Sequence, residues 1–431
     1  MSPRQLPYEP LCSLTVPGDG ITIDYMFFRR AVRAWPSDEK KVNGLETFYR
    51  PTWVEVSMDA LRHNIGAFRQ ALPAGMGLMA VVKADAYGHG AVKVAREAID
   101  CGAAYIGVAF LDEGLELRRA GVRAPILVLG YTPPEGLPIA IKEDITLTVF
   151  QDELWAALER QTDPSKLKVH VKIDTGMGRL GLQANEEAIA FLERALRHPL
   201  LDVEGVYTHF ACADEADKSY TLEQHEKFER VVGSFRERGV SFRYLHTGNS
   251  ATGIDCPNLS YNMVRLGISM YGMYPSEQVN KERVELRPVM SLKTKMAHIK
   301  TLPPGAGISY GVIYRTKGEE TIATLPIGYA DGYSRILSEK VHALVRGKRV
   351  PIVGRICMDQ CMANVSTIDN PTKEEEVVLL GAQGSEVVTA EELASLLGTV
   401  NYEVTCMISH RVPRIYIRNG QRIDVANPLL R

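Results

Sequence analysis

The stretch GLMAVVKADAYGHGAVKVAREAIDCG, residues 77–102, decides the fold because a short glycine-containing turn in it joins an apolar run to an amphipathic segment. The apolar run GLMAVV is typical of a buried strand, and the apolar positions after residue 90 recur at helical spacing. A strand followed by a helix of this length predicts one crossover unit of a parallel sheet. The strand ends on Lys83, and this charge at the end of an apolar strand needs an explanation.

The same unit recurs along the chain. Seven more short apolar runs follow, each before an amphipathic helical segment or a short connector: YIGVAF (105–110), PILVLG (125–130), LTVF (147–150), KVHVKID (168–174), VEGVYTHF (203–210), YLHTGNS (244–250) and MVRLG (263–267). Strands that alternate with helices predict a parallel α/β architecture. Eight strands is the number that closes a TIM-type barrel, so we predict an eight-stranded α/β barrel.

The pattern changes after about residue 285. Short alternating runs separated by Gly and Pro turns follow, with one helical segment near residues 390–400. We therefore predict a barrel domain over 47–285 and a mostly β C-terminal domain over 286–431. Residues 1–46 lack sustained periodicity, and we interpret them as a loose extension, either disordered or added by an upstream start, with no assigned function.

Composition narrows the class of function. The formal net charge is −2 with both signs interspersed, which gives no footprint for nucleic acid or an anionic membrane surface. No apolar run approaches the roughly 18–20 residues of a membrane span, and the first residues lack a signal-peptide core. The seven cysteines are scattered and never spaced as CxxC, which disfavours disulfides and a zinc site. We expect a cytoplasmic enzyme with a small-molecule substrate and no metal.

Polar side chains cluster at the carboxyl ends of the predicted barrel strands, where this fold places its catalytic groups. They are Lys83, Lys172, Asp174, Arg179, His209, His246, Asn249, Ser250 and Arg265. The loops after strands seven and eight often hold a phosphate, and here they offer the Ser250 hydroxyl and the backbone amides of Gly267 and Ile268. An anion site is the interpretation we favour, although a GNS turn alone is usually only a turn.

Lys83 is the amine at this rim. A lysine that is desolvated or near cations such as Arg179 and Arg265 has a lowered pKa and can form a Schiff base. A phosphate site, such a lysine and no metal-binding motif together indicate pyridoxal 5'-phosphate. An arginine at the pyridine nitrogen, where many of these enzymes place an Asp, favours simple proton transfer at Cα. Taken alone, Lys83 also fits a snorkelling surface lysine, and Arg265 a structural ion pair.

Eight motifs resemble those of bacterial alanine racemases, in the family's order and over roughly residues 47–427. They are AVVKADAYGHGA (80–91), HVKIDTGMGRLG (170–181), LHTGNS (245–250), NMVRLGISMYG (262–272), GISYG (307–311), LPIGYADGY (325–333), VGRICMDQ (353–360) and RVPRIY (411–416). The resemblance implies an α/β barrel plus a β-rich domain, with the first strand, residues 54–58, joining the second domain.

The resemblance also implies roles for individual residues. Lys83 and Tyr310 would be the two opposed catalytic bases, and Lys83 would also carry the cofactor. The implied cofactor-binding residues are Tyr87, Arg179, His209, Asn249, Ser250, Arg265, Gly267, Ile268 and Tyr402. The implied substrate-binding residues are Arg179, Tyr329, Met358 and Asp359, with His246 behind the site and Lys172 where many members carry a carbamylated lysine.

The implied activity is interconversion of L-alanine and D-alanine by proton transfer at Cα of the external aldimine, which supplies D-alanine for peptidoglycan. A homodimer with active sites shared across the interface is implied as well, because the family supplies Tyr310 from the partner subunit. A serine or broad-specificity racemase, a decarboxylase of related fold, a pyridoxal-phosphate carrier and a cofactor-free aldolase are the alternatives. The second domain with Tyr310 counts against the carrier, and Arg265 counts against the decarboxylase.

Overall fold

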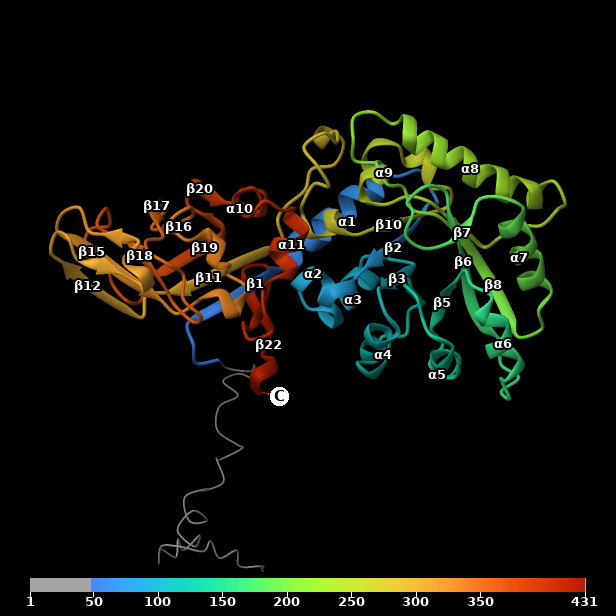
Figure 1. Ribbon diagram of the computed structural model, residues 1–431, viewed down its shortest axis with the longest axis horizontal. Coiled ribbons are helices and arrows are strands. Elements are labelled where there is room, and N and C mark those ends of the chain that lie inside the picture. The colour runs from blue at the N-terminus through green and yellow to red at the C-terminus, as the bar shows by residue number, and fades with distance from the viewer. Residues whose placement is uncertain (1–47, 431) are drawn as a thin grey trace, which may run out of the picture.

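The computed structural model describes residues 48–430, so the predicted N-terminal extension lies outside the described residues. The molecule is elongated, with an α/β barrel at one end and a mostly β region at the other (Figure 1). Both parts of the predicted fold class are confirmed. Within residues 48–430, no helix is long and apolar enough to cross a membrane.

The barrel consists of the eight predicted parallel strands. They are β2 (Gly77–Val81), β3 (Tyr105–Val108), β4 (Ile126–Val128), β5 (Thr146–Val149), β6 (Leu167–Asp174), β8 (Leu201–Tyr207), β9 (Tyr244–His246) and β10 (Met263–Leu266). The last strand, β10, returns to pair with β2, while β9 and β10 form no ladder and leave the barrel nearly closed. The short strand β7 (Leu182–Gln183) adds to β6 outside this order.

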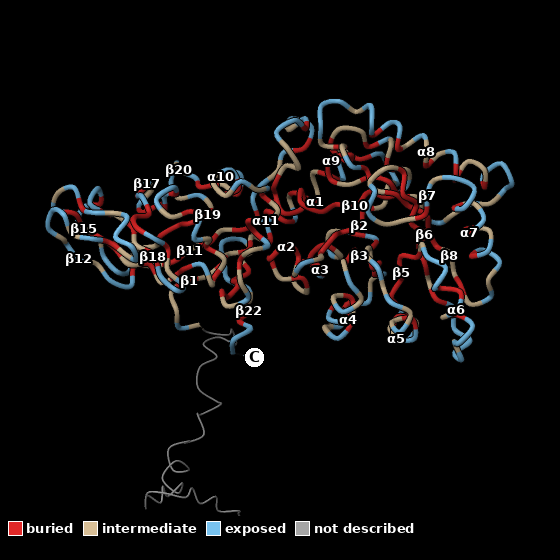
Figure 2. The backbone as a smooth tube through the Cα atoms, in the orientation of Figure 1, coloured by how far each residue is buried: buried red, intermediate tan, exposed pale blue. Residues whose placement is uncertain are grey.

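Helices cover the outside of the barrel because each presents an apolar stripe to the strands. In α3 (Ala91–Asp100), for example, Val94, Ala95 and Ala98 are fully buried. The other covering helices are α1 (Met58–Ala71), α4 (Leu111–Arg119), α5 (Leu137–Lys142), α6 (Glu153–Glu159), α7 (Glu186–Arg197), α8 (Ser219–Arg236) and α9 (Ser250–Asp255). The strands are buried, whereas the outer faces of the helices are exposed (Figure 2).

The second region is built on a sheet of order β17-β16-β19-β11-β1-β21-β22, with β20 beside β19. Its strands are β1 (Thr52–Ser57), β11 (Met290–Lys295), β16 (His342–Val345), β17 (Lys348–Pro351), β19 (Glu376–Gln383), β20 (Glu386–Val388), β21 (Arg414–Arg418) and β22 (Gln421–Ala426). Strand β1 pairs antiparallel with β11 and parallel with β21, so the first strand of the described chain lies among the last.

Smaller elements complete this region and connect it to the barrel. A three-stranded sheet contains β12 (His298–Leu302), β15 (Glu320–Leu325) and β18 (Cys361–Asn364), and β13 (Gly307–Ile308) pairs with β14 (Tyr314–Arg315). Helix α10 (Ala390–Leu397) precedes α11 (Asn401–Cys406), which packs on the helical turn α2 (Lys83–Gly88) after β2. A side chain at Gly88 would collide with the carbonyl of Thr405, so α11 approaches α2 very closely.

Candidate active site

The turn that carries Lys83 is left-handed. Ala84, Asp85, Ala86 and Tyr87 have φ angles of 52°, 52°, 55° and 54°, a region that residues with a Cβ rarely adopt. Each such residue costs about 1–2 kcal/mol relative to a right-handed turn. The turn reverses the chain within a few residues, so that Lys83 and Tyr87 both lie at the barrel rim. Such strain clusters at functional sites, where surrounding contacts maintain it.

Hydroxyl groups and backbone amides form a small cradle beside this turn. Tyr87 is buried there, and its ring centroid lies 6.2 Å from that of Tyr402 on α11. Ser250 Oγ accepts a hydrogen bond from the Gly267 amide at 3.0 Å. A Cβ at Gly267 would lie 2.8 Å from Tyr87 Oη and 4.0 Å from Ser250 Oγ, so only glycine leaves this space open.

The two remaining residues of the predicted anion site differ in their roles. Ile268 begins the 3-10 turn η4 (Ile268–Tyr271) directly after Gly267 and is buried. Asn249 caps α9, because its Oδ1 accepts from the Thr252 amide at 3.0 Å. The Asn249 side chain thus serves the helix that presents Ser250.

Arg265 is the buried cation of the site, with 4% of its surface exposed. Its Nη1 donates to His246 Nδ1 at 2.8 Å and to the His246 carbonyl at 3.0 Å. Its Nη2 donates to the carbonyls of Thr208 and Thr247 at 2.8 and 2.9 Å, and to His209 Nδ1 at 3.0 Å. Among the described residues, the Nε–H is the guanidinium donor left without a partner. Burial lowers the pKa of Arg265 to about 10, at which it stays charged near neutral pH.

These bonds determine the tautomers of three histidines. Because Arg265 only donates, Nδ1 of His246 and of His209 must accept, so both rings carry their proton on Nε2. His246 Nε2 then donates to His170 Nδ1 at 2.8 Å. Burial, followed by the charge of Arg265, holds the pKa of all three imidazoles below the ordinary histidine value. The buried network around Arg265 therefore consists of one guanidinium and three neutral imidazoles.

His170 was not among the predicted site residues. It lies on β6 two positions before Lys172, and residues two apart on a strand share one face. This spacing was the available signal, because Lys172 was expected to point toward the site.

Lys83, Lys172 and Arg179 lie near enough to one another or to Arg265 for their charges to interact, and within the described chain they form no ion pairs. Burial is the main cause, and nearby arginines a further cause, of the lowered pKa values of Lys83 and Lys172. Lys172 is 6% exposed, and its Nζ lies 4.2 Å from the ring centroid of Tyr207. Arg179 is exposed, and no hydrogen bond engages its side chain within the described residues. The rim therefore offers two amines that lose their protons more easily than ordinary lysines.

The remaining predicted residues form a second cluster on the β region, which we call the β-domain cluster: Tyr310, Tyr329, Met358 and Asp359. The backbone amides of Tyr329 and Ala330 donate to the carbonyls of Cys357 and Met358 at 3.0 Å each. Ser309, next to Tyr310, donates from Oγ to the Arg355 carbonyl at 2.6 Å. Three loops distant in sequence thus meet in one cluster. Within residues 48–430, no hydrogen bond or ring contact joins this cluster to Lys83 or Arg265.

Ion pairs of the buried Asp331 hold the loops of the β-domain cluster in place. Asp331 is fully buried and pairs with Arg50 at 2.7 Å and with Arg411 at 3.3 Å. Arg411 also binds Asp359 at 2.7 Å. Sequence reasoning did not single out Asp331, because its partners lie far away in the chain.

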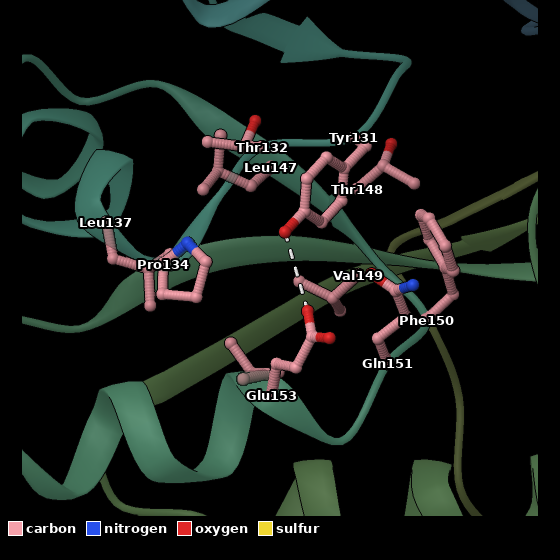
Figure 3. Close-up of a pocket in the computed structure, with 11 residues that line it drawn as sticks. Tyr131, Thr132, Pro134, Leu137, Leu147, Thr148, Val149, Phe150, Gln151 and Glu153 are labelled. Atoms are coloured by element: carbon pink, nitrogen blue, oxygen red, sulfur yellow. Dashed lines mark hydrogen bonds between the residues drawn. The ribbon is translucent and has the colours of Figure 1, made fainter.

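A separate small cavity lies where β4 and β5 end (Figure 3). Its volume is about 30 Å³, and Tyr131 Oη donates to Glu153 Oε2 at 3.4 Å across it. This volume accommodates about one water molecule, which is too little for a cofactor. The cavity contains no predicted site residue.

Two family models match most of the chain. The alanine racemase N-terminal domain matches residues 56–275, and the alanine racemase C-terminal domain matches residues 289–416. An alanine racemase of Halalkalibacterium halodurans is 48% identical over 393 residues, which are 90% of this chain and 100% of that relative.

Solved structures give the same result. An alanine racemase from Bacillus anthracis with bound L-Ala-P is 46% identical with a TM-score of 0.85, and the match covers 89% of this chain and 99% of that one. A histidine racemase from Leuconostoc mesenteroides is 31% identical with a TM-score of 0.80, covering 87% and 100%. By their names, these two proteins act on amino acids whose side chains differ in size.

Proposed function

This chain belongs to the alanine racemase family, and from that premise we propose how its own residues carry out the reaction. It is an amino-acid racemase that interconverts L-alanine and D-alanine. We propose that the D-alanine is used for peptidoglycan. The observation that carries the residue assignment is the barrel rim, where an amine of lowered pKa, an open cradle and a buried guanidinium lie together.

The rim residues fit pyridoxal phosphate. The cradle that a Cβ at Gly267 would fill is bordered by hydroxyl groups, which suits a phosphate. We assign the phosphate to Tyr87, Ser250, Tyr402 and the amides of Gly267 and Ile268. The Nε–H of Arg265, which has no acceptor among the described residues, suits an unprotonated pyridine nitrogen, because a guanidinium can only donate. His209 and His246 hold that guanidinium in place.

The proposed proton transfers use two side chains of this sequence. When bound, the cofactor supplies a conjugated ring that acidifies the Cα–H bond of an amino acid joined to it. Lys83 takes or returns the proton on one face of Cα, and its lowered pKa makes the neutral amine available. Tyr310 acts on the opposite face, since inversion requires a group on each side. Arg179, whose side chain has no hydrogen bond or ion pair within residues 48–430, is assigned to the substrate carboxylate.

Tyr310 belongs to the partner subunit of each site in this proposal. It is 69% exposed, and Met358 and Tyr329 are 53% and 41% exposed on the same cluster. Large apolar side chains gathered at a surface are typical of an interface. A homodimer in which the β-domain cluster covers the partner's barrel rim would unite both bases, together with Met358, Asp359 and Tyr329 of the partner subunit.

Lys172 is proposed to carry a carbamate. Burial lowers the pKa of its amine, and the unprotonated form can attack carbon dioxide, forming an N–C bond and releasing a proton; the resulting anion would offset the nearby arginines. We also propose the domains 47–285 and 286–431, with the first strand, residues 54–58, joining the C-terminal domain, and a cytoplasmic location. The six cysteines among the described residues that are free of disulfides support a reducing compartment.

Mixed dimers test the shared site. Lys83→Ala and Tyr310→Phe should each abolish racemisation of L-alanine, followed by D-alanine formation on a chiral column. Dimers reassembled from the two variants contain one intact site and should recover up to about half of the activity per heterodimer. No recovery in dimers of verified mixed composition would refute the shared site.

Parallel assays with L-serine and L-histidine test the substrate, since a histidine racemase shares the fold. We expect L-alanine to have the highest kcat/KM. A higher kcat/KM for either of the other amino acids would refute alanine as the preferred substrate.

A further inference from the structure

The left-handed turn after β2 needs support from outside itself, because four consecutive residues with side chains adopt positive φ there. Its far end is anchored by Asp85, whose Oδ1 accepts from the Ala91 amide at 2.7 Å, and by Arg414, whose Nε donates to the Gly88 carbonyl at 3.1 Å. Its near end, directly after Lys83, is anchored by another residue.

That residue is Glu113, on the first turn of α4. Its Oε1 accepts from the Ala84 amide at 2.7 Å, and its Oε2 accepts from the Ala109 amide at 2.6 Å. Ala84 follows the lysine after β2, and Ala109 directly follows β3. One carboxylate therefore spans the ends of two adjacent barrel strands, and both oxygens are occupied by backbone amides.

Glu113 also acts on Lys83 electrostatically without pairing with it. Its negative charge raises the pKa of Lys83, against the larger lowering by burial and by Arg179. Glu113 forms no ion pair within the described chain, and its carboxylate instead accepts hydrogen bonds from the two backbone amides. Charge-assisted hydrogen bonds of this kind are stronger than neutral ones.

We propose that Glu113 is a positioning residue of the active site, whose carboxylate holds the left-handed turn so that Lys83 and Tyr87 face the cofactor cradle together. This inference rests on the proposed function of Lys83 and Tyr87. Both carboxylate oxygens of Glu113 accept from backbone amides, and it acts on the turn through the Ala84 amide. No other side chain of the described chain bonds that amide.

Amide hydrogen exchange of the full-length dimer tests this proposal, both with bound pyridoxal phosphate and after its removal. The reporter is a peptide covering residues 83–91. In Glu113→Ala, loss of the bond to Ala84 should speed exchange of this peptide by about 10-fold or more in both forms. Glu113→Gln keeps one acceptor oxygen but turns an NH₂ group toward an amide donor, so it should show a smaller increase.

Asp112→Asn provides the matched control, because Asp112 is the exposed neighbour on α4 and its carboxylate forms no hydrogen bond within residues 48–430. Its exchange should equal that of the wild type. A second readout is the dissociation constant of pyridoxal phosphate, which should rise about 10-fold in Glu113→Ala and stay unchanged in Asp112→Asn.

The readouts separate positioning from general stability. Glu113 also lies in the first turn of α4, so a merely structural role would speed exchange in residues 110–120 and leave residues 83–91 unchanged, which would overturn the proposal. Unchanged exchange of residues 83–91 in both Glu113 variants would overturn it as well. If the wild type fails to bind pyridoxal phosphate, the proposed function fails, while exchange in the cofactor-free protein still tests the link between Glu113 and the turn.

Discussion

Acid should unfold this protein through its buried histidines. His89, His170 and His246 are each 0% exposed. Burial, the largest cause in each case, lowers the pKa of His89 to about 4 and of His170 to about 3, and it holds the pKa of His246 well below its ordinary value. The folded protein therefore keeps all three rings neutral at pH values where the unfolded chain protonates them.

The sign and size follow from proton linkage. An unfolded histidine titrates near pH 6.5, so below that pH the unfolded state binds more protons and stability falls as pH falls. Each ring contributes about 1.4 kcal/mol per pH unit once its unfolded form is protonated. Between pH 7.5 and pH 5, the loss is about 2 kcal/mol per histidine, or about 6 kcal/mol for the three, against a typical total stability of about 5–15 kcal/mol.

Urea unfolding of the cofactor-free protein at fixed concentration, followed by far-UV circular dichroism at pH 7.5, 6 and 5, measures this loss. His170→Asn should reduce the pH slope by about one quarter, because burial lowers the pKa of His209 as well and one of four protons is removed from the linkage. His342→Asn, at an exposed position, should leave the slope unchanged. An unfolding free energy that stays constant from pH 7.5 to pH 5, at constant m-value, would refute the reasoning.

Three further predictions follow from single contacts. Gly267→Ala places a methyl group 2.8 Å from Tyr87 Oη and should weaken pyridoxal-phosphate binding about 10-fold or more in an absorbance titration, whereas unchanged affinity would contradict the cradle. Asp331→Ala leaves two arginines without their buried carboxylate and should lower the urea unfolding free energy by about 3–5 kcal/mol; a loss below about 1 kcal/mol would contradict this. Native mass spectrometry in bicarbonate should detect one added carbon dioxide per chain, absent in Lys172→Ala; equal masses would contradict carbamylation.

The barrel could be predicted from sequence because its signals are local. Each strand is a short apolar run before an amphipathic helix, and the eight runs correspond to β2, β3, β4, β5, β6, β8, β9 and β10. The polar residues at the strand ends followed from the same reasoning, since parallel strands end at one rim. The positions of Lys83 and Arg265 at the ends of two predicted strands were therefore enough to place both residues at this rim.

The left-handed turn could not be predicted in this way. Ala84, Asp85 and Ala86 carry no local signal for positive φ, and the two glycines nearby suggested an ordinary loop. The conformation is held by Glu113 and Arg414, which lie 29 and 326 residues from their partners. Contacts of such long range determine the backbone there, so local propensity has little influence.

The hydrogen-bond acceptors of Arg265 could not be predicted from the sequence either. Three of its five acceptors are backbone carbonyls at the ends of β8 and β9, and every residue has a carbonyl, so sequence cannot single them out. His170 was missed for a related reason, because a lone histidine on a strand is usually a satisfied core residue. Its role became visible only through the 2.8 Å bond to His246.

The proposed division of the site between the two ends of the molecule separates cofactor binding from inversion at Cα. Every group assigned to the cofactor, from Lys83 to Tyr402, lies at one barrel rim of a single chain, and α11 of the same chain completes the cradle. The proposed second base, Tyr310, lies on the exposed β-domain cluster, which no contact of the described chain brings to that rim. A single chain should therefore bind pyridoxal phosphate but lack the group that inverts Cα. Dilution below the dimer dissociation constant should then abolish racemisation while leaving cofactor affinity largely unchanged, and loss of both at the same protein concentration would show that the partner subunit also shapes the cradle.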